Sequence, residues 1–226
     1  MSSCFFRHKR QREKVDMIGV IRTLTKRMFS PKYLLLTNTV SSGVLLSLGD
    51  ILQQFNERRI ARKKLLLKVN AASASGTVDH IHVGEDDVRG AVPAFNWIRT
   101  GRMLTIGILL GPLNHYWYLA LDKFLPGVKA RTVAKKILLD ELIASPVMTS
   151  TFFVGMGLLE GKTLAESVDV LKKKFLTVYM LDWCVWPACQ AINFTFVPMH
   201  LRVVYVNTVT LGWDTFLSFI IHTYQR

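Results

Sequence analysis

YLLLTNTVSSGVLLSLGDILQQF, residues 33–55, is an apolar run of the length that a helix needs to cross a bilayer. Crossing the hydrocarbon core takes about 20 residues, at about 1.5 Å of rise per residue. Four more runs of similar length follow along the chain, and they cover 102–121, 137–159, 175–199 and 203–221. Runs this long are too frequent for a soluble domain of 226 residues. The sequence therefore predicts an all-α, polytopic transmembrane bundle of about four to five helices within 33–226.

Most of these runs also contain acidic side chains. A charged side chain at the middle of a bilayer costs about 3 kcal/mol on insertion scales. We therefore expect the acids to face one another, the bundle interior or the membrane interface. They are Asp50, Asp140 with Glu141, Asp182 and Asp214.

Polar side chains also recur at helical spacing. Trp183, Trp186, Gln190, Asn193 and Val197 follow spacings of three and four, so they share one helical face. Such a seam either lines a narrow pathway or fixes the bundle by hydrogen bonds between helices. Arg202 lies in the link between the last two runs, and we expect it to form a structural ion pair with Asp182 or Asp214. The seam candidates are Asp50, Gln53, His115, Asp140, Asp182, Gln190, Asn193, Arg202, Asn207 and Asp214.

Small residues predict where the helices approach closely, because lipid provides no hydrophobic drive for helices to associate. Three small-residue ridges occur, one in each of the first three runs. They are Thr39–Gly43–Ser47, Gly107–Gly111 and Gly157–Gly161. Proline removes a backbone donor from a helix, so we expect kinks at Pro112, Pro146 and Pro187.

The segments outside the runs are strongly basic, and the chain has a formal net charge of +13. Residues 1–32 form a basic, acid-poor segment, which is either a mitochondrial targeting signal or an arm that lies on anionic lipid. Residues 56–96 are predicted to form a long polar loop, whose start could continue the first helix for a few turns. Lysines and arginines lie on both sides of the first run, so they do not orient the protein.

No motif for catalysis is found in the sequence. The three cysteines, Cys4, Cys184 and Cys189, form no metal-binding pair, and no Gly-rich nucleotide fingerprint or nucleophile with a placed base occurs. We therefore predict that the chain is not an enzyme, and we expect neither a cofactor nor a metal site.

The C-terminal half carries a specific pattern of aromatic, proline and amide residues. It resembles the signature of the Mpv-17 / 22-kDa peroxisomal membrane protein family. The second run adds the pattern Gly111-Pro112-x-x-His115, and the first adds Gly49-Asp50 followed by Gln53. The chain departs from the family where Asp140 is followed by Glu141 instead of glutamine, and its polar loop is unusually long. The signature residues are Trp183, Trp186, Pro187, Phe194, Pro198 and Trp213.

This resemblance implies two different functions. Stretches 182–188 and 210–215 look most like a branch of the family whose role is in the mitochondrial inner membrane, in mitochondrial ribosome assembly and mitochondrial translation. Membrane lipid and mitochondrial ribosomal subunits would then be the partners, with rRNA phosphates drawn to the N-terminal arm, Lys129–Lys136 and Lys172–Lys174. The alternative is an inner-membrane or peroxisomal channel for small solutes. Its lining would be Gln190, Asn193, Asn207 and Asp214.

Overall fold

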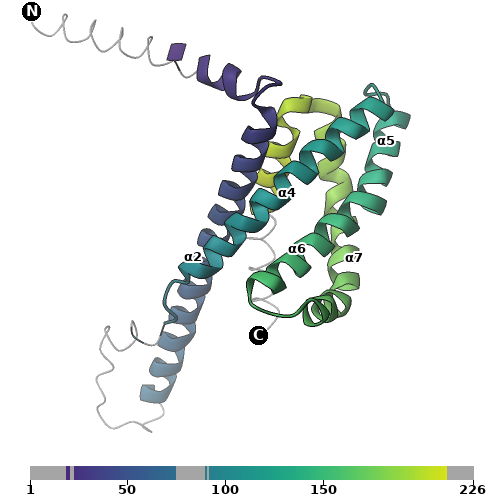
Figure 1. The fold of residues 1–226 in the computed structure, drawn as a ribbon. Coiled ribbons are helices and arrows are strands. Elements are labelled where there is room, and N and C mark those ends of the chain that lie inside the picture. The colour runs from purple at the N-terminus through teal and green to yellow at the C-terminus, as the bar shows by residue number, and fades with distance from the viewer. Residues whose placement is uncertain (1–18, 21–22, 75–89, 91, 213–226) are drawn as a thin grey trace, which may run out of the picture.

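The computed structural model describes residues 19–20, 23–74, 90 and 92–212, and all regular structure within them is helical (Figure 1). This confirms the all-α class. Trp213 and Asp214 lie outside the described residues, as does most of the N-terminal arm. The main helices are α2 (Leu34–Ala74), α4 (Trp97–Phe124), α5 (Ala130–Leu139), α6 (Ser145–Leu159) and α7 (Leu164–Phe196). A π turn, η1 (Asp140–Ala144), joins α5 to α6, and a short 3₁₀ turn, η2 (Met199–Leu201), leads into helical residues 202–212.

The first long helix, α2, is polar on its inner face and apolar on its outer face. Its buried face carries hydrogen-bonding side chains four or eight residues apart, and its exposed face carries aliphatic side chains at a spacing of four. The buried residues are Asn38, Ser42, Asp50 and Gln54. The exposed residues are Leu36, Val40, Val44, Leu48 and Leu52. In water the exposed aliphatic face would be unfavourable. In lipid this face contacts hydrocarbon, and the polar face finds hydrogen-bond partners inside the bundle.

Two helices of the described residues are long and apolar enough to cross a membrane, as judged by length and composition. They are Leu34–Ala71 and the continuous helix Ala130–Leu159. Large apolar side chains are also exposed along α4 and α7, for example Ile108, Leu109, Leu181 and Ile192. The outer surface of the bundle is thus apolar on several helices, which agrees with the transmembrane bundle that the sequence predicts.

The α2–α4 contact depends on the small residues that the sequence singled out. A Cβ atom added to Gly107 would lie 2.6 Å from the Cα of Gly43, and one added to Gly111 would lie 2.7 Å from the Cα of Thr39. Both neighbours are backbone atoms, which cannot move aside. The first two ridges therefore pack against each other. The prediction for the third ridge, Gly157–Gly161, is half wrong. Gly157 packs against Ser167, but Gly161, at φ +82°, lies in the turn after α6.

The prolines act differently from one another. Pro112 and Pro187 lie inside helices that continue through them. Pro146 is at the start of α6, directly after the π turn, where the Ser145 amide donates to the carbonyl of Asp140. Pro146 has no amide hydrogen to continue the regular ladder. The irregularity expected at this proline is therefore one π turn, and this turn contains both acids of the third run.

Two helices, α7 and α2, extend more than ten residues beyond the predicted apolar runs within them. The capping box at Thr163 and Glu166 starts α7 eleven residues before the predicted run, and its hydrogen bonds hold the pKa of the Glu166 carboxyl below its usual value. Helix α2 continues to Ala74, so residues 56–74 are helix and not loop. This stretch contains many Leu, Lys, Arg and Ala residues and no Gly or Pro, which favours helix.

Candidate functional site: a buried polar network

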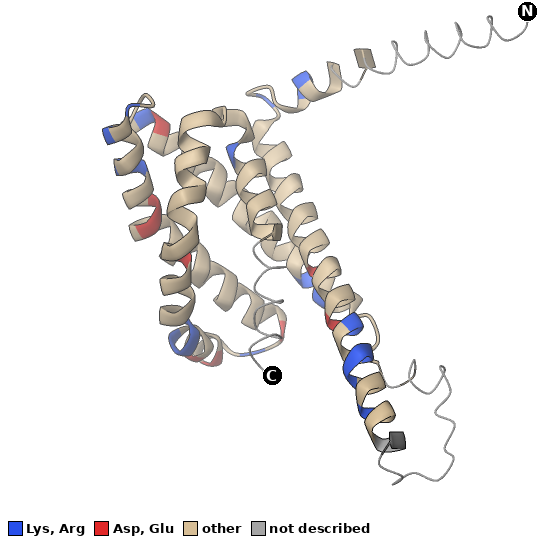
Figure 2. Ribbon diagram, turned by 180° about the vertical axis from the view of Figure 1, so that it is seen from behind, with Lys and Arg blue, Asp and Glu red and all other residues tan. Residues whose placement is uncertain are grey.

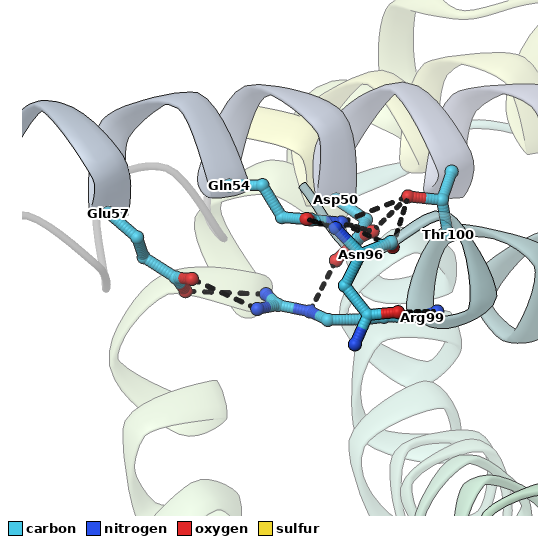
Figure 3. Close-up of polar contacts among 6 residues, drawn as sticks. All are labelled: Asp50, Gln54, Glu57, Asn96, Arg99 and Thr100. Carbon is cyan, nitrogen blue, oxygen red and sulfur yellow. Dashed lines mark hydrogen bonds and ion pairs between the residues drawn. The ribbon is translucent and has the colours of Figure 1, made fainter. Parts of the chain in front are cut away.

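The first part of the network joins α2 to the start of α4 (Figure 3). The Asp50 carboxylate lies 2.6 Å from Arg99 Nε and accepts hydrogen bonds from Thr100 Oγ1 at 2.6 Å and Gln54 Nε2 at 2.7 Å. Arg99 also forms a two-pronged contact with Glu57, at 3.0 and 3.3 Å. One oxygen of Asp50 thus accepts both hydrogen bonds, and the other lies in the ion pair with Arg99. The first predicted seam acid has partners inside the bundle.

The amide that partners Asp50 is Gln54 and not Gln53. Gln54 is buried, because it lies one turn after Asp50 on the same face, whereas Gln53 is only half-buried. Gln54 also bonds both backbone polar groups of Asn96, at 2.7 and 3.1 Å, and the Asn96 side chain caps α4. The four-residue spacing from Asp50 was the available signal for this correction.

The second part of the network joins α4, η1 and α7. Asp140 accepts a hydrogen bond from Trp117 Nε1 at 2.7 Å on one oxygen and from Gln190 Nε2 at 2.6 Å on the other. Gln190 Nε2 also donates to the Tyr118 hydroxyl at 3.0 Å, and Gln190 Oε1 accepts from Asn193 Nδ2 at 2.8 Å. All of these groups except Trp117 are buried. The structure thus brings three of the seam candidates, Asp140, Gln190 and Asn193, into one hydrogen-bonded group.

Next to this network lies a carboxyl group without a hydrogen-bond partner. The Glu141 side chain is 0% exposed, and neither of its oxygens has a partner among the described residues. Asp140 and Asp182 are near enough to act on it electrostatically, and both are acids. Tyr179 donates to the backbone carbonyl of Glu141 and not to its side chain. Asp182 itself accepts from Ser145 Oγ at 3.1 Å. Among the described residues of the network, Glu141 therefore stands out because neither of its two side-chain oxygens is hydrogen-bonded.

A third part, at the other end of α4, pairs two cations with one acid. Arg202 Nη1 and Lys136 Nζ each lie 2.6 Å from the same oxygen of Asp122. Both cations also lie over the ring of Phe194, at 5.3 and 5.7 Å from its centroid. The ion pair predicted for Arg202 exists, but its partner is Asp122 and not Asp182. The reason is that α4 ends beside the link after α7, a relation that no local pattern encodes.

Two more seam candidates bind the first helix. Asn38 Nδ2 lies 2.9 Å from His115 Nδ1, and Asn207 Nδ2 donates to Ser42 Oγ at 2.7 Å. Trp183, by contrast, is 39% exposed, and its neighbour Asp182 is buried in its place.

The remaining signature residues have structural places. Phe194 is at the centre of the core, Trp186 packs against that core, Pro187 lies within α7 and Pro198 precedes η2.

The polar and charged side chains of the network mainly satisfy one another's hydrogen bonds and charges. These side chains donate and accept among themselves across α2, α4, α5, η1, α6, α7 and the helical residues 202–212. No group of metal ligands occurs in the described part of the chain. The hollow on the α2–α4 surface is lined by residues such as Val44 and Leu104 and includes none of the predicted seam. Fold and network together define a helical membrane protein with its polar groups turned inward.

Comparison with known proteins assigns this protein to a family. The model described as the Mpv17 / PMP22 family matches residues 157–218. PXMP2/4 family protein 4 of Dictyostelium discoideum is 33% identical over 78% of this chain and 94% of its own length. The chain belongs to the Mpv17 / PMP22 family. No solved structure matches it.

Other relatives indicate the membranes in which the family occurs. Peroxisomal membrane protein 2 of Bos taurus is 28% identical over 82% of each chain. Mitochondrial inner membrane protein Mpv17 of Danio rerio is 29% identical over 79% of this chain and 85% of its own length. These are the two locations, mitochondrial inner membrane and peroxisomal membrane, that the sequence predicted.

Proposed function

We propose that this chain is a mitochondrial inner-membrane protein that supports assembly of the mitochondrial ribosome and mitochondrial translation. One observation carries the proposal: most acidic and amide groups inside the bundle, Glu141 excepted, have partners within it, whereas most of the described lysines and arginines are exposed and lie toward the helix ends (Figure 2). Such a chain offers a basic surface outside the bilayer and a closed interior. The resemblance of stretches 182–188 and 210–215 to Mpv-17-like protein 2 supports the same role.

The basic surface is narrower than the sequence suggested. Lys136 is only 1% exposed and is bound to Asp122, so it is not available to a partner. Lys129, Arg131 and Lys172–Lys174 are exposed. Attraction between exposed cations and rRNA phosphates is independent of sequence and weakens steeply with salt.

Sedimentation of detergent-solubilised mitochondria tests this function. The tagged chain should migrate with a ribosomal subunit at low salt and should leave it progressively as salt is raised. Dissociating the ribosome by chelating Mg²⁺ should move the chain together with the subunit it binds. Absence of comigration at every salt concentration would contradict the proposal.

A channel for small solutes is the second candidate, and the buried acids favour it. Asp140, Glu141 and Asp182 bring negative charge into the bundle interior, where it would attract cations if the helices separated. Purified protein in planar bilayers should then conduct, and Asp140→Asn should change the cation selectivity. Bilayers that stay silent with folded protein would exclude this function.

A further inference from the structure

Helix α2 extends well beyond the bundle. Its 41 residues correspond to about 60 Å of helix, roughly twice the thickness of the hydrocarbon core. Glu57 still contacts α4 through Arg99, and after that point α2 continues past the start of α4 as a single helix (Figures 1 and 2). We call residues 58–71 the α2 extension.

The α2 extension is basic and contains no acid. Its cations are Arg58, Arg59, Arg62, Lys63, Lys64 and Lys68. Four of them, Arg59, Lys63, Lys64 and Lys68, have exposed side chains and pair with no carboxylate among the described residues. At 3.6 residues per turn, Arg59 and Lys63 lie about 40° apart on one side of the helix, and Lys64 and Lys68 lie about 40° apart on another side, centred about 140° round the helix from the first pair. The exposed positive charge therefore lies on two sides of the helix and covers about half of its circumference.

This geometry disfavours the lipid surface as the partner. If residues 34–54 cross the hydrocarbon core, Arg59 lies about 8 Å and Lys68 about 21 Å further along the axis. A typical tilt of about 20° shortens that reach only slightly. The outer cations then lie beyond the headgroups and project into water. An acidic protein patch would face one side of the helix and leave the other pair of cations without a partner.

The phosphate backbone of a folded RNA fits both features. Phosphates of two strands border each groove, so cations on two sides of one helix can reach both strands. We infer that the α2 extension binds the phosphate backbone of structured RNA at the membrane surface. The inference rests on the proposed function, for which it names the contact: ribosomal RNA docks on this helix.

The test uses the full chain in nanodiscs of neutral phosphatidylcholine, with a fluorescent RNA hairpin as probe. The extension variant replaces Arg59, Lys63, Lys64 and Lys68 by Gln, which preserves helix propensity. The matched control replaces Arg59 by Lys, and Lys63, Lys64 and Lys68 by Arg, so that the same four positions keep their charge. The extension variant should bind the hairpin at least about tenfold more weakly and reduce the salt slope by about three to four, while the control should change affinity by less than about threefold.

Two results would overturn the inference. Equal losses in the extension variant and in the charge-preserving control would mean that the four positions act through the shape of the helix and not through contacts of their charge with phosphate. Unchanged binding in the extension variant would mean that RNA, if bound, docks elsewhere. A parallel measurement in nanodiscs containing anionic lipid covers the membrane alternative, because an extension that lies on headgroups would there become protected from protease and lose its RNA affinity.

The same variants separate this inference from the proposed function. If the extension variant still comigrates with ribosomal subunits in mitochondria and binds the hairpin normally, the inference fails while the function stands. If the wild-type chain never comigrates with subunits, the function fails, whatever the hairpin measurement gives.

Discussion

Gln190 of α7 donates a 2.6 Å hydrogen bond to Asp140 in the π turn before α6. The same amide nitrogen bonds the Tyr118 hydroxyl of α4 at 3.0 Å. A single side chain thus links three helices, and it does so where water is excluded. Hydrogen bonds to a charged group are stronger than neutral ones, and the loss of one partner leaves the other without compensation.

Replacing this amide should therefore destabilise the bundle. Gln190→Leu removes the donor to Asp140 and the acceptor for Asn193, and we expect a loss of about 2–4 kcal/mol in the free energy of unfolding. Thermal unfolding in detergent, followed by circular dichroism, measures it. Ile192→Ala, at an exposed position of the same helix, is the control and should change stability far less. Similar losses for both variants would argue against the network.

Glu141→Gln should stabilise the protein. The Glu141 carboxyl is buried with no hydrogen-bond partner and two acids nearby, so its charged form has nothing to offset its desolvation. The amide has the same shape and no charge, and we expect a gain of about 1–3 kcal/mol. Unfolding in detergent near neutral pH tests this. Glu160→Gln, whose carboxylate pairs with exposed Lys162, should have little effect. A destabilised Glu141→Gln protein would show that the carboxylate has a partner after all.

Gly107→Ala should disrupt the α2–α4 contact, because the new Cβ would collide with the backbone at Ser42 and Gly43. We expect a loss of at least about 2 kcal/mol. Gly101→Ala, in the same helix but with no atom within 4 Å of the added Cβ, should be neutral or slightly stabilising. Disulfide trapping between cysteines placed in α2 and α4 would report the separation directly. If both alanine variants behave alike, this contact is not close-packed.

Removing Asp122 should lower the free energy of unfolding more than removing either of the two cations that pair with it. Asp122→Leu leaves Lys136 and Arg202 buried, unpaired and close together, so we expect a loss of about 3–5 kcal/mol. Arg202→Leu leaves one ion pair intact and should cost less. Unfolding measurements on the two variants give the order. The reverse order would mean that solvent already screens the two cations.

The length of α2 shows which part of a helix its local sequence could predict and which part it could not. The apolar run from Tyr33 to Phe55 predicts a spanning helix, and the structure has a helix there that is long and apolar enough to span. The run by itself did not show that the helix continues to Ala74, because the polar composition of the next residues is compatible with loop as well as helix. Helix-forming residues without Gly or Pro were the signal for the longer helix.

For the network residues, the sequence predicted which side chains are buried better than it predicted which side chains they contact. Asp50, Asp140, Gln190 and Asn193 are buried as their spacing suggested. At Gln53 and Trp183 the buried side chain is instead that of an adjacent residue. Such errors arise because a short stripe leaves about 100° of uncertainty in which side of the helix faces the core.

The sequence by itself determined that this chain is a helical membrane protein, that its acids and amides turn inward and that small residues mark where helices approach closely. These features follow from composition and helical period, which are local. Only the tertiary structure decided which helices meet and which side chains pair: Arg99 with Asp50, Asp122 with Arg202 and, among the described residues, no side-chain partner for Glu141. Those choices depend on how far each helix slides and rotates against its neighbours. The close contact of Gly107 with Gly43 sets that register for α2 and α4, and no residue-by-residue pattern contains it.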